Sequence, residues 1–328
     1  MLEKIKKIGV LTSGGDSPGM NAAIRAVVRA CAFYGLECIG IYRGYEGLIE
    51  GDFEALSARS VRNIVNKGGT FLKSTRSIEF KSESGRAKAH KNLENAHIDA
   101  LVVLGGDGTF AGAAAFGAEY DFPIVGVPST IDNDINGTDY TIGYDTALNT
   151  AMEAIDKIRD TANSHNRLFL VEVMGRSSGD IALNSGVGAG AEEILIPEEE
   201  NGIDILLKSL ERSKKSGKTS SIIVVAEGEK SGKNIFELAE FIKQKTNGYE
   251  IRVSILGHIQ RGGSPSCFDR VLASRLGVAA VEALLAGNRN VMMGILHKKV
   301  VPVDFRTAIE GKRTFDKELR KVLNITSI

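Results

Sequence analysis

Three carboxylates lie close together in the stretch TIDNDINGTD, residues 130–139. Asp132, Asp134 and Asp139 fall within eight positions, with no Lys or Arg among them. Like charges this close repel, and a buried carboxylate needs a partner. In an extended chain Asp132 and Asp134 would point to the same side, because side chains alternate with a period of two. Such a pair suits phosphoryl transfer, where one carboxylate deprotonates a hydroxyl and the other holds a metal. Taken alone, the stretch is equally explained by a solvated acidic loop.

A further carboxylate stands in the glycine-rich loop LGGDGTFAG. Asp107 lies between Gly106 and Gly108, where a strand ends, a helix begins and the backbone can approach phosphates. A carboxylate beside a phosphate needs an intervening cation, and Mg²⁺ is the oxygen-seeking candidate. A plain N-cap is the alternative role for Asp107. Because this loop lies one strand–helix unit upstream of TIDND, we expect the two to serve one reaction.

The loop TSGGDSPGMN repeats the same design near the start of the chain. Gly14 and Gly15 allow a sharp turn after a strand, and a helix is expected to begin near Gly19. The amide groups at that helix start would form a phosphate site. The alternative is an ordinary tight turn between strand and helix.

Several cations stand at strand ends or in glycine-rich loops. Arginine binds phosphate in a bidentate manner and keeps its charge. The candidates are Arg76, Arg167, Arg176, Arg252 and, in the stretch GHIQRGG, His258 and Arg261. Arg25 and Arg29 share one helix face, and either an anion site or a solvated face explains them.

The elements that must position these residues follow a regular order. Runs of strand length such as KIGVLTS, DALVVLGG, PIVGVPS, RLFLVEVMG and SIIVVAEG alternate with helical patterns. Continuous Val/Ile/Leu runs are typical of strands buried on both faces of a parallel sheet. We predict an α/β fold of two doubly wound lobes with mostly parallel sheets and helices on both faces, because about ten strands exceed one compact sheet.

Composition excludes other classes. The chain has 328 residues, with 41 basic and 41 acidic side chains, so net charge gives no argument for nucleic acid or an anionic membrane. It contains no apolar run long enough for a membrane span, and the first residues are expected to form a strand rather than a signal peptide. Three cysteines without metal or disulfide spacing fit a cytoplasmic chain.

Six stretches together resemble the bacterial 6-phosphofructokinases that use ATP. They are GVLTSGGDSPGMNAAIR, GGTFLKSTR, GGDGT, PSTIDNDINGTDYTIG, EVMGRSSGD and LGHIQRGGSP, in that family's order over about residues 5–300. GGDGT alone also occurs in lipid and NAD kinases, which leave TIDND and HIQRGG unexplained.

The resemblance implies a role for each matching residue. The catalytic set would be Asp132 as general base for the sugar 1-hydroxyl, with Asp134, Arg176 and Thr130. Positions for MgATP would be Gly15, Arg76, Ser77, Gly106, Asp107, Gly108 and Thr109, with Asp107 as the Mg²⁺ ligand. Positions for fructose 6-phosphate would be Thr130, Ile131, Asp132, Arg167, Met174, Gly175, Arg176, Glu227, Arg252, His258 and Arg261.

The resemblance also implies an assembly. Arg167 and Arg252 would reach a neighbouring subunit's site in a homotetramer, and their charges would help to balance the acidic loop. The nucleotide lobe would hold residues 1–142 and 259–309, and the sugar-phosphate lobe residues 143–258 and 310–328. An effector pocket for ADP or GDP, or for phosphoenolpyruvate, would use Arg25, Arg29, Arg159, Glu192 and Lys218. Ala58 and Ser216 replace basic residues that some members carry there, which predicts weak effector binding.

Two rivals are weighed against ATP-dependent phosphorylation of fructose 6-phosphate. Pyrophosphate-dependent relatives typically carry Asp after GGD and Lys before TIDND, where this chain has Gly108 and Ser129. Ser129 also departs from the ATP-dependent enzymes, which usually have Gly. A catalytically silent nucleotide sensor would be expected to lose Asp107 or Asp132, and both are present.

Overall fold

The computed structural model describes residues 5–165, 167–217, 220–246, 249–311 and 313–327. These residues form two compact units. Unit 1 holds the chain up to Ile131, together with Ile135–Thr146 and Arg261–Arg313. Unit 2 holds Asp132–Asp134, Ala147–Gln260 and the residues from Thr314 onward. The chain therefore passes between the units several times, and each unit is described by itself.

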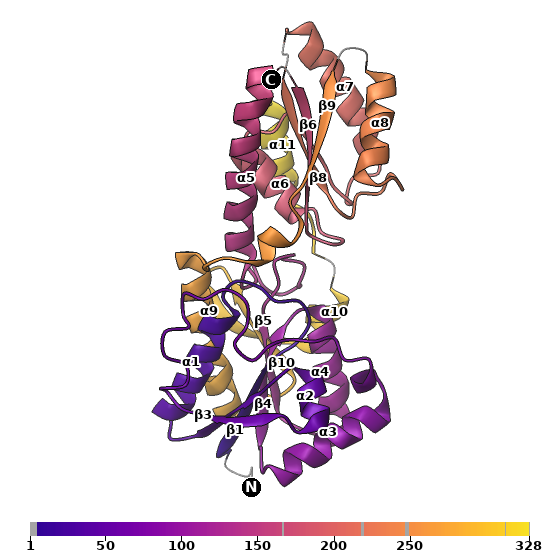
Figure 1. The fold of residues 1–328 in the computed structure, drawn as a ribbon. Coiled ribbons are helices and arrows are strands. Elements are labelled where there is room, and N and C mark those ends of the chain that lie inside the picture. Colours follow the sequence, from indigo (N-terminus) through magenta and orange to yellow (C-terminus); the bar gives the residue numbers. More distant parts are fainter. Residues whose placement is uncertain (1–4, 166, 218–219, 247–248, 312, 328) are drawn as a thin grey trace. The chain divides into compact units, whose positions relative to one another are not determined.

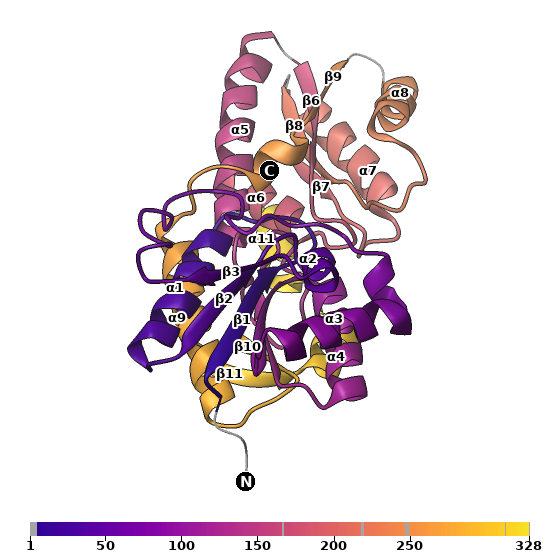
Figure 2. The ribbon, with the colours of Figure 1, turned by 60° about the horizontal axis from the view of Figure 1, so that its bottom comes forward.

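Unit 1 is built on a seven-stranded sheet with the order β11-β10-β5-β4-β1-β2-β3 (Figures 1 and 2). Its strands are β1 (Lys7–Thr12), β2 (Glu37–Ile41), β3 (Phe53–Leu56), β4 (Ala100–Gly105), β5 (Ile124–Pro128), β10 (Val291–Leu296) and β11 (Lys299–Asp304). Its helices are α1 (Met20–Phe33), α2 (Tyr45–Glu50), η1 (Glu79–Lys81), α3 (Glu83–Asn95), α4 (Asp107–Tyr120), α9 (Cys267–Leu285) and α10 (Phe305–Glu310).

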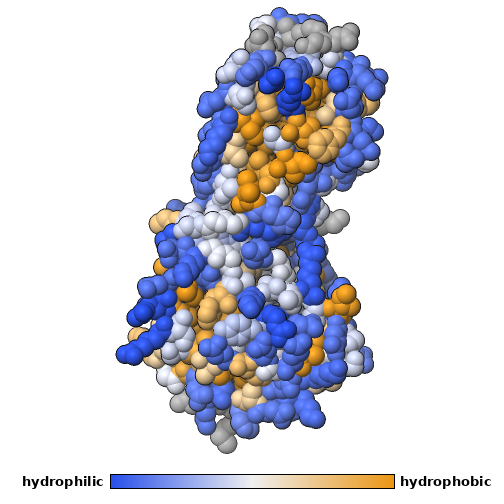
Figure 3. Space-filling model, in the orientation of Figure 1, coloured by the Kyte–Doolittle hydropathy of each residue, from blue (hydrophilic) through white to orange (hydrophobic). Residues whose placement is uncertain are grey.

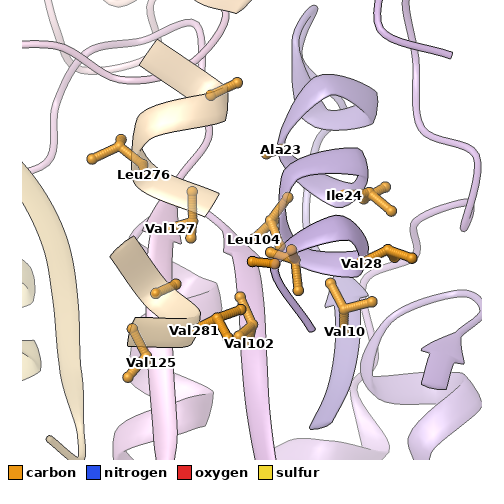
Figure 4. Close-up of a cluster of buried hydrophobic side chains, with 14 of the residues drawn as sticks. Val10, Ala23, Ile24, Val28, Val102, Leu104, Val125, Val127, Leu276 and Val281 are labelled. Carbon is orange, nitrogen blue, oxygen red and sulfur yellow. The ribbon is translucent and has the colours of Figure 1, made fainter. Parts of the chain in front are cut away.

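Alternating side chains of the central strands fill two cores, one on each face of the sheet. Val102 and Leu104 of β4 pack with α1 and α9, a cluster that Figure 4 shows in close-up. Leu101 and Val103 of the same strand pack with Phe110 and other residues of α2, α3, α4 and α10. Because both faces are covered, the strand must be apolar at every position, which explains its unbroken run of aliphatic residues.

Unit 2 has a four-stranded parallel sheet with the order β7-β8-β6-β9. Its strands are β6 (Arg167–Val173), β7 (Glu193–Leu195), β8 (Ser221–Ala226) and β9 (Glu250–Ile255). Its helices are α6 (Asp180–Gly188), α7 (Gly202–Lys215), α8 (Ile235–Lys245) and α11 (Lys317–Thr326), and α5 (Tyr144–His165) and η2 (Gly257–Arg261) continue across its boundary with unit 1. Figure 1 shows α7 and α8 on one side of this sheet, with α5, α6 and α11 on the other.

The predicted fold class, α/β with helices on both faces of mostly parallel sheets, is confirmed. Two antiparallel pairs occur, β2 with β3 and β10 with β11, and each places an edge strand on the large sheet. β3 has only four residues and β11 contains Pro302, so neither shows the continuous aliphatic run of a central strand. In the part of the chain that the structure describes, none of the helices is both long and apolar enough to span a bilayer.

Candidate active site

In unit 1 the loop after β1 lies against a second loop from residues 73–77. Gly14 has a φ of 88°, which a side chain would disfavour, and its carbonyl accepts a hydrogen bond of 2.7 Å from Ser74 Oγ. The Gly14 amide donates to the Thr75 carbonyl at 3.5 Å. These contacts place exposed Arg76 and half-buried Ser77 in a segment tied to the glycine turn. Two of the predicted nucleotide segments are therefore brought together.

The third predicted nucleotide segment, at the start of α4, joins the same loop. Thr109 Oγ1 donates to the Ser13 carbonyl at 3.1 Å, so the helix start is fixed beside the β1 turn. Asp107 and Gly108 are exposed, and a Cβ added at Gly108 would meet nothing within 4 Å. The N-cap position belongs to Gly106 and Asp107 is the first helical residue, so Asp107 is not the N-cap. The helix start thus presents exposed backbone at Gly108 and one exposed carboxylate.

This donor set fits a magnesium ion shared with a nucleotide. Among the described residues no three His, Cys, Asp or Glu side chains gather into a metal group. Mg²⁺ commonly uses one or two carboxylates and completes its octahedron with phosphate oxygens and water. Asp107, exposed in the first turn of α4, meets that requirement.

The strand β5 leads into the residues before the acidic loop. Thr130 is buried, its carbonyl accepts a 2.6 Å hydrogen bond from Thr141 Oγ1, and Ile131 is fully buried. A Cβ placed at Gly106 would lie 3.8 Å from Thr130 Cβ, so Thr130 adjoins the α4 start. Ser129 is also buried and donates to the Val127 carbonyl at 3.3 Å. Its hydroxyl thus bonds to the backbone of its own strand.

The acidic loop differs from its expected conformation. Asn133 has a φ of 51°, in the left-handed region, so the chain between Asp132 and Asp134 is not extended. The prediction that alternation places both carboxylates on one side was therefore wrong in its geometry. Asn133 is buried, and its Nδ2 donates to Asp180 Oδ2 at the start of α6, at 3.2 Å. Asp132 is only 2% exposed and Asp134 is half-buried.

In unit 2 the loop after β6 is held by side chains. Glu227 Oε1 accepts from the amides of Gly175 at 3.3 Å and Arg176 at 2.7 Å. Met174 is buried, whereas Arg176 is exposed. A Cβ at Gly228 would lie 1.9 Å from the Arg176 carbonyl, so only glycine permits this approach. Met174, Gly175, Arg176 and Glu227 are therefore neighbours, as a joint role requires.

Arg167 and Arg252 lie elsewhere in unit 2. Arg167 begins β6, and its Nε donates to Glu250 Oε2 at 3.1 Å, while Arg252 pairs with Oε1 of the same carboxylate. The hydrogen bond from Arg167, then the charges of both arginines, hold the pKa of Glu250 below its usual range. Seven residues of extended strand, roughly 20 Å, separate Arg167 from Met174. Arg252 pairs in register with Phe169, five positions before Met174, so both arginines lie back along the strands from the loop that carries Met174.

The stretch GHIQRGG forms η2 and the turn that follows it. His258 is exposed. Arg261 Nη1 donates to the Asp16 carbonyl at 3.2 Å, and a Cβ at Gly15 would lie 2.5 Å from that nitrogen. Arg261 therefore packs on the predicted nucleotide loop of unit 1.

The predicted effector residues fall into two groups. On α1, burial and the neighbouring charge of Arg29 lower the pKa of Arg25, which indicates a concentration of positive charge. In unit 2, Arg159 Nη1 lies 3.7 Å from Glu192 Oε1. Lys218 lies outside the described residues.

Three residues that hold these segments were not predicted from the sequence. Asn133 and Asp180 fix the acidic loop, and Gln260 accepts a hydrogen bond from the Met174 amide at 3.0 Å. Gln260 stands inside the GHIQRGG stretch, so an amide among cations in a glycine-rich turn was the available signal. Asp180 is the last residue of the stretch EVMGRSSGD, so a carboxylate at the end of a glycine-containing motif was the available signal.

Comparison with known proteins gives one consistent result. The family model described as "Phosphofructokinase" matches residues 7–284. The chain is 54% identical to the ATP-dependent 6-phosphofructokinase of Bacillus pumilus over 99% of this chain and 100% of that protein. The chain belongs to the phosphofructokinase family. The family predicted from the motifs is therefore confirmed.

Further relatives of the family agree. The ATP-dependent 6-phosphofructokinase 2 of Bacteroides thetaiotaomicron is 51% identical over 99% of both chains. The crystal structure of Pichia pastoris phosphofructokinase in the T-state superimposes with a TM-score of 0.89 and 38% identity. That match covers 100% of this chain and 37% of the Pichia chain.

Proposed function

We propose that this chain transfers the terminal phosphoryl group of MgATP to the 1-hydroxyl of fructose 6-phosphate, giving the 1,6-bisphosphate in glycolysis. The observation that carries the proposal is identity above one half, along almost the full length, to enzymes named for this activity. The presence of Asp107 and Asp132 within the family's motifs agrees with an active enzyme.

Asp132 serves as the general base in this proposal. It would accept the proton of the sugar 1-hydroxyl as that oxygen bonds to phosphorus, and its burial keeps water from competing. Thr130, Asp134 and Arg176 would orient the reacting groups and bind the developing charge. Because phosphoryl transfer depends mainly on positioning and charge, fixed placement of these side chains is the chain's main contribution.

The nucleotide would bind at the loops of unit 1. Backbone amides near Gly15, Gly106 and Gly108 would receive the phosphates, with Thr109, Arg76 and Ser77 beside them. Asp107 would hold the magnesium ion, which neutralises phosphate charge when bound. The open space at Gly108 leaves room for the phosphates.

The sugar phosphate would bind at the loops of unit 2. The proposed binding set for the sugar joins Ile131 and Asp132 with Met174, Gly175, Arg176 and Glu227, and His258 and Arg261 would bind the 6-phosphate. Arg167 and Arg252 stand too far along the sheet for the same chain's loop, which supports their action on a neighbouring subunit. A homotetramer with shared sites follows from this proposal.

The surface of unit 2 is compatible with such an assembly. Figure 3 shows an apolar area in the region of β6, β8 and β9, between α5 and α8. Ile255 at the end of β9 is 50% exposed, and Ile259 in η2 is 58% exposed. Exposed apolar patches of this kind mark association surfaces.

The proposal places the protein in the cytoplasm and includes an effector pocket. Arg25 and Arg29 on one subunit, with Arg159, Glu192 and Lys218 on another, would bind ADP, GDP or phosphoenolpyruvate. Ala58 is exposed and Ser216 Oγ bonds to the Ser213 carbonyl, so neither adds a cation.

A coupled assay with fructose 6-phosphate and three donors tests the function. ATP should support turnover, and pyrophosphate should not, because Gly108 and Ser129 supply neither the carboxylate nor the cation of the pyrophosphate-dependent relatives. The kcat/KM with GTP, compared with that for ATP, measures how strictly the enzyme selects the nucleobase of the donor. Comparable kcat/KM with ATP and pyrophosphate would refute the proposed donor.

A further inference from the structure

Gln260 is a buried amide that the reaction itself does not require. It is the last residue of this segment of unit 2 and is fully buried. Its Oε1 accepts a hydrogen bond of 3.0 Å from the Met174 amide. Its Nε2 is also buried and has no hydrogen-bond partner within the described part of the chain. The opposite orientation of the amide would face two donors toward each other, so the oxygen must point to Met174.

The segment that Gln260 contacts has an unusual backbone. Gly175 has a φ of 145° and Arg176, which is not glycine, has a φ of 52°. Backbone in these regions persists only where surrounding contacts impose it. Three successive amides are taken by two side chains: Met174 by Gln260, and Gly175 and Arg176 by Glu227. The loop conformation therefore depends on these two acceptors.

An unsatisfied buried donor is unfavourable, so an amide is a poor choice for packing alone. An apolar residue of similar length would fill the same volume without leaving Nε2 unpaired. What the amide provides is the acceptor at Met174. The cost of the orphaned nitrogen thus indicates selection for that one hydrogen bond.

We propose that Gln260 is a positioning residue for fructose 6-phosphate, holding the main chain of Met174–Arg176 in the conformation that presents the Met174 and Arg176 side chains to the sugar. The inference deepens the proposed function and rests on it. Gln260 acts through the loop and does not touch the substrate. The following residue, Arg261, contacts the Asp16 carbonyl on the nucleotide side, so removing only the Gln260 oxygen should affect the sugar phosphate and spare ATP.

Gln260→Met tests the proposal, because methionine has similar length and no strong acceptor. We expect KM for fructose 6-phosphate to rise about tenfold, KM for ATP to stay within about twofold, and kcat to fall less than about threefold. Asn92→Leu is the matched control. Asn92 Nδ2 donates to the Leu48 and Ile49 carbonyls in unit 1, so its loss should lower Tm and leave both KM values unchanged.

Two further measurements separate positioning from general stability. Gln260→Glu keeps an oxygen acceptor, and burial without a cation favours its protonated, uncharged form. It should therefore return KM for fructose 6-phosphate to within about threefold of wild type. Hydrogen exchange in a peptide covering residues 174–178 should be at least about tenfold faster in Gln260→Met, while a peptide covering Leu48 and Ile49 is unchanged.

The outcomes distinguish the inference from the function on which it rests. If wild type does not phosphorylate fructose 6-phosphate, the proposed function fails. If wild type is active and Gln260→Met keeps its KM for fructose 6-phosphate, Gln260 has no positioning role. A fall in Tm with equal changes in both KM values would also overturn it. Should Gln260→Met not fold, slow exchange at residues 174–178 in wild type, and a normal KM in Gln260→Glu, still support the role. A Gln260→Glu protein with the KM defect overturns it.

Discussion

The two sets of proposed substrate loops are built in different ways. In unit 1 the nucleotide loops contain Gly14, Gly106 and Gly108, and they contact each other largely through main-chain atoms and hydroxyls. In unit 2 the loop after β6 is held by the side chains of buried Gln260 and exposed Glu227, which accept from the amides of Met174, Gly175 and Arg176. Gly175 and Arg176 have positive φ values. Phosphates can be bound by open backbone amides. A sugar must be recognised by placed side chains, so the second loop needs a fixed conformation.

The largest effect on activity should follow removal of the proposed general base, Asp132. Asp132→Asn should lower kcat by about 10²–10⁴, the usual contribution of a positioned general base, and leave fructose 6-phosphate binding intact. Steady-state kinetics and calorimetric binding measure the two quantities. Asp139→Asn is the control in the same acidic stretch, because Asp139 Oδ2 accepts from the His297 amide at 2.7 Å. Near wild-type turnover of Asp132→Asn would contradict the assignment.

An added carboxylate at Gly108 should oppose ATP binding at the proposed nucleotide loops of unit 1. Gly108→Asp should raise KM for ATP about a hundredfold, since like charges brought together cost several kcal/mol. Gly108 is the second residue of α4, where an acidic side chain suits the helix, so folding should survive. Gly108→Ala controls for bulk. An unchanged KM for ATP in Gly108→Asp would show that the phosphates do not approach this position.

The sugar side should depend on a second subunit. Arg252→Ala should raise KM for fructose 6-phosphate about tenfold to a hundredfold, because a charge-assisted hydrogen bond contributes roughly 1.5–3 kcal/mol. KM for ATP should change less. Mixing Arg252→Ala with Asp132→Asn under conditions that exchange subunits should form some hybrid sites with neither defect and restore activity. Full activity from a monomer, seen by light scattering under assay conditions, would refute shared sites.

The effector pocket should respond weakly. Ala58 and Ser216 stand at two positions where some family members carry basic residues. The loss of two charge-assisted contacts to phosphate weakens effector binding by about a hundredfold or more. Coupling to fructose 6-phosphate can persist, because it depends only on differential affinity for two states. ADP, GDP and phosphoenolpyruvate should be titrated at sub-saturating sugar phosphate. A strong response at low micromolar concentration would contradict the weakened pocket.

The smallest effect concerns Asp269, a buried carboxylate of unit 1 that accepts hydrogen bonds from main-chain amides. Asp269 accepts from the amides of Gly143 at 2.9 Å and Thr146 at 2.8 Å, at the start of α5. Burial raises the pKa of Asp269 from 3.8 to about 6. The folded state therefore binds this proton more tightly, and the resulting stability is present at low pH and lost as pH rises through 6.

Asp269→Asn should remove that dependence. Between pH 7 and pH 5 the wild type should gain about 1 kcal/mol of unfolding free energy relative to the variant. Urea midpoints followed by circular dichroism at both pH values measure the difference. Equal changes in wild type and variant would show that Asp269 ionises in the folded state as it does in the unfolded chain.

Most strands, the fold class, the glycine loops and the family could be predicted from the sequence. These properties are local or additive: aliphatic runs report burial on both faces, and glycine after a strand reports a turn that other residues disfavour. The motifs also predict roles for Asp107, Asp132 and the cations, because their chemistry depends on residue type, and these roles stay predictions. The edge strands β3 and β11 were harder, since short or proline-containing strands lack the aliphatic run.

Only the tertiary structure decided how those residues are held. The left-handed turn at Asn133 depends on its contact with Asp180, 47 positions away. The role of Gln260 depends on Met174, 86 positions away. The separation of Arg167 from Met174 follows from the strand between them being straight and extended. Such facts arise from contacts between distant segments, and local sequence preferences carry no information about which distant partner will be present.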